Sequence, residues 1–299
     1  MRHQRSIVRS ATAIGAGAEH LLRGASQGAT RGVTSRGVFV QTGRGWLFLS
    51  AEVLRGPLTV NICGDGSWLS VVEHDTTVVV EPLALRLLPS GWTADLDQAQ
   101  VWRAPGRGAM ADRAETQRRR IARLSTRIPQ PVSAEWMGCL AGWIAQGLPQ
   151  AERPEHPQAD RCASLARAIA GGDAAEGSSL MEGLLGWGRG LTPSGDDCLI
   201  GVLLALSRGG QESQVAESIL EAAGEVVAQK ADERTTSISA SLLTCAAQGE
   251  ADERLIALVD HVQTGMPGEA EALAAVSDWG ASSGWDALAG IGLTLSRVL

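Results

Sequence analysis

Aromatic side chains are scarce in this sequence of 299 residues: tyrosine is absent and phenylalanine occurs twice. Proteins that hold single-stranded nucleic acid stack its bases on aromatic rings, and nucleic-acid binders in general present a basic face. The formal net charge here is -7. Both observations argue against a nucleic-acid binder, so we expect no nucleic acid among the partners.

Lysine and long apolar runs are scarce as well. Lys230 is the only lysine, so any Schiff-base chemistry would depend on that one residue. No uninterrupted apolar run approaches the roughly 20 residues that cross a bilayer, and the apolar stretch of the basic N-terminus is too short for a signal peptide. We therefore expect a cytoplasmic protein with no membrane partner.

Paired cysteines are a third absence. The five cysteines are an odd number, and none forms a C-x-x-C motif. Unpaired thiols are typical of a reducing compartment, and no histidine stands at zinc-binding spacing from a cysteine. The sequence thus predicts no zinc site, and it predicts that Cys198 and Cys245 are buried, reduced and chemically inert.

The first third of the chain has the pattern of short β-strands. Segments such as "GVFVQTG", "GWLFLSAEV" and "TTVVVEPLALRLLP" are rich in Val, Leu and Thr and are bounded by Gly or Pro. No helical stretch long enough for a crossover separates them, which favours an antiparallel sheet, a sandwich or a small barrel. We predict a β-rich domain over residues 1–105.

Helical patterns dominate the rest of the chain. Residues 106–159 are predicted to form connecting helices and a Pro-rich loop, with Ser133 as a helix cap. From residue 160 onward apolar residues recur at spacings of three and four, and most segments end at glycine. The predicted fold class is therefore α+β: an N-terminal antiparallel β-rich domain followed by a C-terminal all-helical domain over residues 160–299.

The stretch "GLTPSGDD", residues 190–197, carries the start of one of these helices. Two capping schemes fit it: Ser194 as N-cap with a carboxylate three residues on, or Thr192 as N-cap with Pro193 in the first helical position. Neither scheme requires the adaptable "GWGRG" just before it or two adjacent aspartates, whose side chains point in different directions on a helix. A ligand held at this helix start is the alternative to simple capping.

The same pattern occurs a second time near the C-terminus. "SGDDCLIGVLLAL", 194–206, aligns without gaps on "SGWDALAGIGLTL", 283–295, so that Asp197 matches Asp286 and Gly201 matches Gly290. A glycine inside a helix costs about 1 kcal/mol against alanine. Two such glycines at equivalent places predict that the two helices approach closely, related by a rough two-fold, with both N-termini at one end. Coincidence between two capped, Leu-rich helices is the alternative.

Two converging helix N-termini would offer free N–H donors and positive potential to an anion. We expect the backbone around Gly190, Gly195 and Gly284 to provide these donors. The aspartates would repel an anion unless they accept an N–H of the substrate or hold a metal, and Mg²⁺ suits paired aspartates and hydroxyls. An anion bound without a cofactor is the preferred interpretation, and Mg²⁺ is the alternative.

A third polar stretch, "DERTTSISASLL", 232–243, starts another helix. Taken alone, it fits an N-cap with a packing face of small residues; together with the first two stretches it is expected to form a wall of the same site. Arg189 and Arg234 are predicted to pair with a carboxylate or phosphate, because the guanidinium group forks onto both. The predicted catalytic residues are Asp196 and Asp197. The predicted substrate-binding residues are Arg189, Gly190, Thr192, Ser194, Gly195, Arg234, Thr235, Thr236, Ser239, Ser283, Gly284 and Asp286.

Three blocks, "GRGLTPSGDDCLIG", "TTSISASLLTCAAQGE" and "GASSGWDALAGIGL", resemble the signature blocks of a bacterial family of unknown function. Some of its members are described as a subunit of oxamate carbamoyltransferase in allantoin catabolism, a branch of purine degradation. The resemblance implies transfer of a carbamoyl group: oxalurate plus phosphate gives oxamate plus carbamoyl phosphate. It also implies a hetero-oligomer with two other kinds of subunit.

Other functions stay open at this point. The chain could instead be a non-catalytic partner or regulatory subunit with a small-anion pocket, or a Mg-dependent hydrolase that uses Asp196 and Asp197. No histidine lies in the three blocks, so a general base is missing from them unless His20 or His74 arrives from the N-terminal domain.

Overall fold

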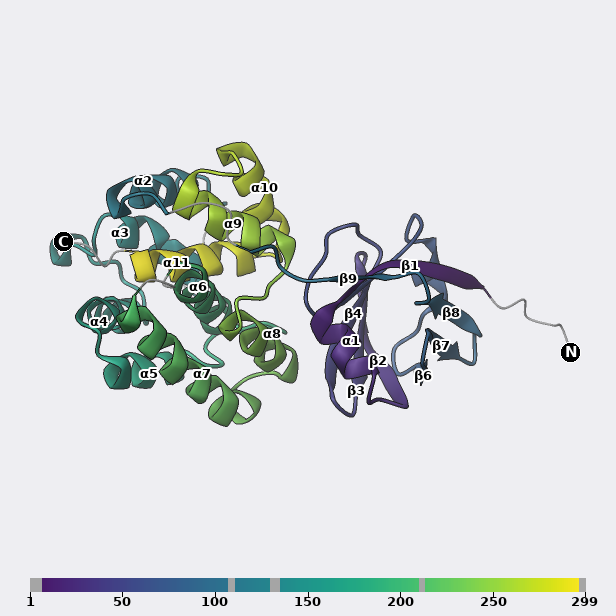
Figure 1. Cartoon of the computed structure of the whole chain (residues 1–299). Coiled ribbons are helices and arrows are strands. Elements are labelled where there is room, and N and C mark those ends of the chain that lie inside the picture. Colours follow the sequence, from purple (N-terminus) through teal and green to yellow (C-terminus); the bar gives the residue numbers. More distant parts are fainter. Residues whose placement is uncertain (1–6, 107–110, 130–134, 210–212, 296–299) are drawn as a thin grey trace, which may run out of the picture. The chain divides into compact units, whose positions relative to one another are not determined.

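The computed structural model describes residues 7–106, 111–129, 135–209 and 213–295. The chain divides into two compact units, Met1–Ala104 and Pro105–Leu299. The predicted α+β fold class is confirmed, because the strands lie in the first unit and all α-helices but one short one lie in the second, as far as the structure describes the chain (Figure 1). The predicted cap Ser133 lies outside the described residues.

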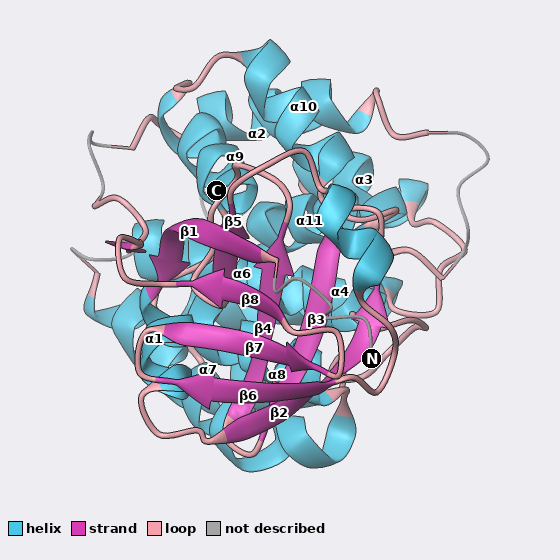
Figure 2. Cartoon of the chain, turned by 90° about the vertical axis from the view of Figure 1, so that its right-hand side faces the viewer, coloured by secondary structure: helices cyan, strands magenta, loops and turns pink. Residues whose placement is uncertain are grey.

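The first unit is a barrel-like sheet with one short α-helix, α1 (Ala16–Leu22). Its strands are β1 (Val8–Gly15), β2 (Gln27–Val33), β3 (Gly37–Thr42), β4 (Gly45–Ser50), β5 (Thr59–Ile62), β6 (Thr77–Glu81), β7 (Ala84–Leu88), β8 (Trp92–Asp95) and β9 (Gln100–Trp102). The sheet order is β5-β4-β3-β2-β6-β7-β8-β1-β9, and β5 also pairs with β1 (strands in magenta, Figure 2). That last pairing closes eight strands into a ring.

Most neighbours in the ring are antiparallel, as the sequence predicts, but three pairings in the sheet are parallel. These are β4 with β5, β1 with β8, and β1 with β9. The first half of β1 pairs with β8 and its second half with β9. No local sequence pattern predicts these parallel pairings. β1 is far from β8 and β9 in the sequence, and β4 is connected to β5 by a loop instead of the usual helix.

The apolar side chains that alternate along the strands fill the inside of the ring. Val38 and Val40 on β3, Leu47 and Leu49 on β4, and Leu85 and Leu87 on β7 are all at most 1% exposed. Successive side chains of a strand point to opposite faces, so these residues share the inner face. The indole rings of Trp68 and Trp92 stack in the same core with their centroids 4.8 Å apart.

The second unit is helical in its described parts. Its helices are α2 (Ala114–Ser125), α3 (Ala141–Ala145), α4 (Ala159–Gly171), α5 (Ala174–Glu182), α6 (Ser194–Gly209), α7 (Gln214–Arg234), α8 (Ser237–Ala247), α9 (Glu253–Thr264), α10 (Glu269–Asp278) and α11 (Ser283–Leu295). A 3-10 turn, Met137–Leu140, precedes α3. No helix of the described residues is both long enough and apolar enough to cross a membrane.

The helices α6 and α11 form the centre of this unit. Every residue of α6 from Ser194 to Leu206 is buried, which is the mark of a helix surrounded by protein on all sides. Figure 1 shows α2, α9 and α10 on one side of the pair and α5, α7 and α8 on the other. The two copies of the repeated sequence therefore occupy the core of the unit.

Cys198 on α6 is buried, as predicted, whereas Cys245 is half-buried. The prediction of a buried side chain was wrong for Cys245, which lies in the last turn of α8 between exposed Thr244 and buried Ala246. All five cysteines are free thiols.

Candidate functional site at the paired helix starts

The helices α6 and α11 touch backbone to backbone at two equivalent places. A Cβ added at Gly201 would lie 2.1 Å from the carbonyl oxygen of Ala287, and one added at Gly290 would lie 1.9 Å from that of Cys198. Cys198 and Ala287 match each other in the repeat, as do the two glycines. The contact is therefore reciprocal, and the close two-fold packing predicted from the repeat is confirmed.

The starts of the two helices also meet. The Thr192 and Ser283 hydroxyl oxygens lie 3.2 Å apart in a hydrogen bond. The backbone N–H of Met137 donates to Ser194 Oγ at 2.7 Å, and the next N–H, that of Gly138, donates to Asp286 Oδ1 at 2.7 Å. One short turn thus binds the beginning of both helices, which places the two N-termini side by side.

A Trp-Gly pair precedes each helix and extends the repeat. The N–H of Gly195 donates to the carbonyl of Trp187 at 2.8 Å, and the N–H of Gly284 donates to the carbonyl of Trp279 at 2.9 Å. The following glycines, Gly188 and Gly280, have φ of +109° and +70°, a conformation that favours glycine. Sequence comparison of the two copies overlooked this pair because the loop from Trp-Gly to Ser-Gly differs in length between them.

These bonds correct two expectations. The N–H groups of Gly195 and Gly284 are engaged by tryptophan carbonyls, so they are not free to bind an anion. Neither Ser194 nor Thr192 is the N-cap of α6, because the carbonyl that receives the first helical bond, from the N–H of Asp197, is that of Pro193. The hydroxyls of both residues are used instead to join α6 to its neighbours.

Asp196 joins three segments of the site. Its Oδ1 accepts the N–H of Gly186 at 2.8 Å, and its Oδ2 accepts the hydroxyl of Thr235. Burial raises its pKa, and these two bonds together with the nearby Ser239 hydroxyl counteract the rise. A carboxylate held in this way on both sides acts as a structural clamp between the glycine-rich turn, α6 and the segment before α8.

The Thr235–Ser239 segment lies where the sequence analysis placed it, beside the first motif. Thr236 caps α8 by accepting the N–H of Ser239 at 3.1 Å, and its hydroxyl donates to the carbonyl of Leu191. Ser239 is fully buried, and its hydroxyl lies near the Asp196 carboxyl, whose pKa it lowers, without meeting a described partner in hydrogen-bonding geometry.

Asp197 differs from its neighbour. Its carboxyl is fully buried, and neither oxygen has a described partner in hydrogen-bonding geometry. Burial raises its pKa well above the usual range, and the negative charge of Asp286 raises it further, while the nearby hydroxyls of Ser283 and Thr192 lower it. A buried carboxyl without a described donor is rare in native proteins.

Asp286 is the equivalent of Asp197 on α11, and only one of its two carboxyl oxygens accepts a described hydrogen bond. Oδ1 accepts the N–H of Gly138, but Oδ2 has no described partner. Burial raises the pKa of Asp286 to about 7, and the bonds from Gly138 and the Ser194 hydroxyl limit the rise. The pairing is crosswise: the serine of each copy acts on the aspartate of the other, Ser194 on Asp286 and Ser283 on Asp197.

The two predicted arginines lie at the surface. The Arg189 side chain is 84% exposed and pairs with Glu135 at 3.2 Å. Arg234 is exposed and makes no ion pair with a described residue. Its backbone carbonyl packs on Gly186, where an added Cβ would lie 2.0 Å from it. Gly190 is exposed in the loop between Arg189 and Thr192, with φ of +98° and open space around it.

One residue near the motif escaped the sequence analysis. His156, from the Pro-rich loop before α4, is buried, and its ring meets that of Trp187 edge-on at 5.3 Å between centroids. Burial lowers its pKa, which favours the neutral imidazole. No local pattern predicts this contact, because the loop and the motif are about 30 residues apart in the chain.

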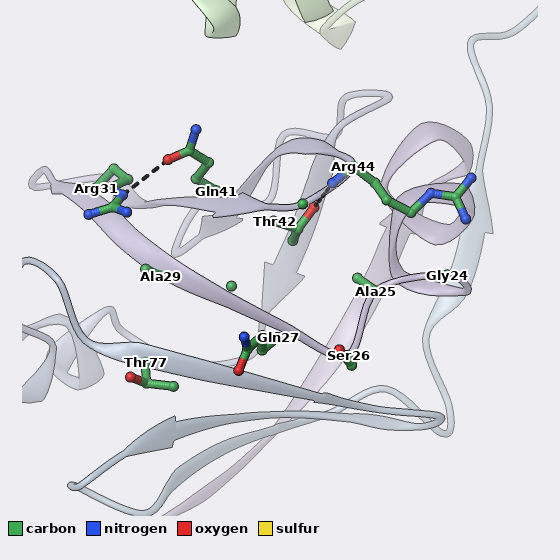
Figure 3. Close-up of a pocket in the computed structure, with 12 residues that line it drawn as sticks. Gly24, Ala25, Ser26, Gln27, Ala29, Arg31, Gln41, Thr42, Arg44 and Thr77 are labelled. Atoms are coloured by element: carbon green, nitrogen blue, oxygen red, sulfur yellow. Dashed lines mark hydrogen bonds between the residues drawn. The ribbon is translucent and has the colours of Figure 1, made fainter.

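Two further features bear on ligands. The described residues contain no group of three or more His, Cys, Asp or Glu side chains that could hold a metal ion. A pocket of the first unit is lined by the turn from Gly24 to Ser26, by β2 and β3, and by Arg44 and Thr77 (Figure 3). Arg31 in its lining donates to Gln41 Oε1 at 3.1 Å. This pocket contains none of the predicted site residues.

The model of the family described as oxamate carbamoyltransferase subunit AllH matches residues 184–295. The predicted family resemblance is confirmed over this segment. The match begins just before the glycine-rich turn and ends with α11, so it contains both copies of the repeat and the Thr235–Ser239 segment. No curated protein and no solved structure matches the chain.

Proposed function

We propose that this chain is a subunit of an oxamate carbamoyltransferase and that it binds a small anion with a carbamoyl or amide group at the starts of α6 and α11. The Asp197 carboxyl carries the proposal, because it is fully buried with neither oxygen hydrogen-bonded among the described residues. Leaving a buried polar group without a partner costs about 1–3 kcal/mol. An N–H of the substrate amide supplies the missing donor.

The hydroxyls between Asp197 and the surface complete the amide end of the site. Thr192 and Ser283 are half-buried, lie against each other and act on the Asp197 carboxyl. A hydroxyl can donate and accept, so this pair can exchange its mutual bond for bonds to the carbonyl oxygen and amide of a substrate. The substrate thereby reaches Asp197 without disturbing the Asp196 clamp.

The anionic group of the substrate binds to the guanidinium groups of Arg234 and Arg189. Arg234 has no carboxylate partner among the described residues, whereas Arg189 is already paired with Glu135. A guanidinium group binds a carboxylate or a phosphate with two parallel hydrogen bonds. We assign the larger share of anion binding to Arg234, and we expect Arg189 to be released from Glu135 when the substrate binds.

The family description names a subunit, so we propose that the chain acts in a hetero-oligomer with other carbamoyltransferase subunits. The direct test is phosphorolysis of oxalurate to oxamate and carbamoyl phosphate, assayed with this chain alone and with its partner subunits. We expect turnover by the assembled complex and its loss, by roughly 100-fold or more, in Asp197→Asn. The matched control is Asp173→Asn, the same chemical change at an exposed position outside the site, which should keep full activity.

Two outcomes separate the alternatives. If Asp197→Asn abolishes binding of oxamate in calorimetry but leaves turnover of the complex unchanged, the pocket is regulatory and the chain is a non-catalytic partner. If turnover requires added Mg²⁺ and continues without phosphate, a hydrolase replaces the transferase as the function. Normal binding and normal turnover in the variant would refute the assignment of Asp197 altogether.

A further inference from the structure

Two buried aspartates lie at the starts of α6 and α11, but binding of the substrate amide uses only Asp197. Asp197 and Asp286 occupy the same position of the two repeat copies, and both are fully buried at the meeting point of the helix starts. Three of their four carboxyl oxygens have no described hydrogen-bond partner, namely both of Asp197 and Oδ2 of Asp286. The remaining oxygen is held by the N–H of Gly138.

When two carboxyls are buried near each other, ionising both costs free energy because the two negative charges repel. The charge of Asp286 disfavours ionisation of Asp197, and such an interaction is mutual. The groups with the largest effects on either carboxyl are hydroxyls, backbone N–H groups and the neighbouring carboxyls, and none of them is an arginine, lysine or histidine side chain. The surroundings offer hydroxyls and backbone N–H groups, which cannot neutralise two negative charges.

We propose that Asp197 and Asp286 hold one proton between them and that this proton is delivered to the leaving nitrogen during carbamoyl transfer. The reaction named here rests on the proposed function, whereas the shared proton rests on the two buried carboxyls and their unpaired oxygens. Asp197 is the member that meets the substrate. Asp286 is a positioning residue that keeps the proton available by opposing its loss from Asp197.

The proton balance of the reaction fits this device. An oxygen of hydrogen phosphate attacks the carbamoyl carbon of oxalurate, the bond from that carbon to the oxamate nitrogen breaks, and the nitrogen needs one proton to leave as an amide. One Asp197 oxygen gives the shared proton to the nitrogen while the other accepts the terminal amide N–H. The proton carried by hydrogen phosphate then refills the pair, so the site returns to its starting state without an added reactant.

The Thr192 and Ser283 hydroxyls provide the route for refilling. They lie 3.2 Å apart, both are half-buried, and Ser283 acts on Asp197. Either hydroxyl can be the donor, so a proton can pass along the pair in either direction. The other titratable groups at the pair are Asp196, whose charge raises the pKa of Asp197 less than that of Asp286 does, and the thiols of Cys139 and Cys198, whose pKa values burial raises.

The test that does not depend on activity is a titration of ¹³C-labelled aspartate carboxyls by NMR in the full chain. We expect Asp197 to lose its proton at a pH lower by about one unit or more in Asp286→Asn, and Asp286 to respond likewise in Asp197→Asn. In Asp286→Asn the amide oxygen still accepts the Gly138 N–H, and Asp197→Asn removes a carboxyl to which no described backbone N–H donates, so both variants are expected to fold. Asp196→Asn is the matched control, because Asp196 is adjacent and buried but clamped, and it should move the Asp197 midpoint by less.

The second readout is the pH profile of oxalurate phosphorolysis by the complex. We expect kcat to fall as the pH rises through the loss of the shared proton, and this fall to begin at lower pH in Asp286→Asn. If each aspartate titrates with an unchanged midpoint when the other is replaced, the shared proton is refuted even if oxalurate is turned over. If the midpoints shift as expected but oxalurate is not a substrate, the proton pair stands and the proposed reaction fails.

Discussion

Asp196 and Asp197 are adjacent in the chain, yet their carboxyls meet opposite surroundings because neighbours on a helix point in different directions. Asp196 accepts from Gly186 and Thr235, whereas no described donor meets either Asp197 oxygen in hydrogen-bonding geometry. We predict that Asp196→Ala lowers the free energy of unfolding by about 1–3 kcal/mol, because it leaves the half-buried Gly186 N–H and Thr235 hydroxyl without their acceptor. Urea denaturation at pH 8 measures the change.

The contrast at pH 8 is Asp197→Asn. The amide is uncharged, so it removes the cost of burying an unpaired carboxylate, and the variant should be as stable as the wild type or more so. An equal loss of stability in both variants would mean that the two aspartates share one structural role.

The pH dependence of stability follows from Asp286. Burial raises its pKa to about 7 in the folded chain, against roughly 3.9 in an unfolded chain. The folded state therefore binds this proton more tightly, so the stabilisation is complete below about pH 4 and is lost as the pH rises through about 7. We predict that the wild type loses stability between about pH 5 and pH 8 and that Asp286→Asn loses less. Chemical denaturation at both pH values decides it, and an unchanged slope in the variant would contradict the assignment.

At the scale of elements, the repeat predicted the central helix pair and its close contact from sequence alone. Gly201 and Gly290 carried that information, because a glycine inside a helix has a cost that packing must explain. The helix starts were predicted less well. The backbone donors and hydroxyls there bond to Trp187, Trp279 and the Met137–Gly138 turn, and a single sequence does not reveal which of several partners a donor takes.

Because α6 and α11 are in backbone contact, adding one methyl group at Gly290 should lower the stability of the protein. In Gly290→Ala the new Cβ would lie 1.9 Å from the Cys198 carbonyl oxygen, so the two helices must separate. We expect the unfolding free energy to fall by about 1–3 kcal/mol, the usual cost of overpacking. Thermal denaturation monitored by circular dichroism measures it.

The matched control is Gly224→Ala on α7, where an added Cβ meets nothing within 4 Å among the described residues. Alanine has the better helix propensity by about 1 kcal/mol, so this variant should be slightly more stable than the wild type. If Gly290→Ala were equally harmless, the helices would not be in backbone contact.

At the scale of the whole molecule, composition and periodicity predicted the order of strands before helices but not how the sheet closes. Alternation in β3, β4 and β7 shows which side chains face inward, because it is a local property. The pairings of β1 with β5, β8 and β9 join the first strand to segments about 50 to 90 residues away. Such contacts depend on packing of the complete sheet, and the strands themselves carry no signal for them.

The thiols report on the folding of both units at once. Cys63 is exposed in the first unit, whereas Cys162 and Cys198 are buried in the second. Burial raises the pKa of Cys139 to about 11 and the pKa values of Cys162 and Cys245 to about 12. At pH 8 only about one in a thousand molecules or fewer would carry a thiolate at these positions, and the thiolate is the reactive form.

We therefore predict that one thiol, that of Cys63, reacts rapidly with a disulfide reagent in the native protein and that the other four react only after denaturation. Counting the released chromophore over time at pH 8 tests this, with Cys63→Ser as the control that should remove the fast phase. Rapid labelling of Cys245 in Cys63→Ser would show that its half-buried position leaves it reactive. Rapid labelling of Cys198 would contradict the packing of α6, because its side chain is fully buried in the folded unit.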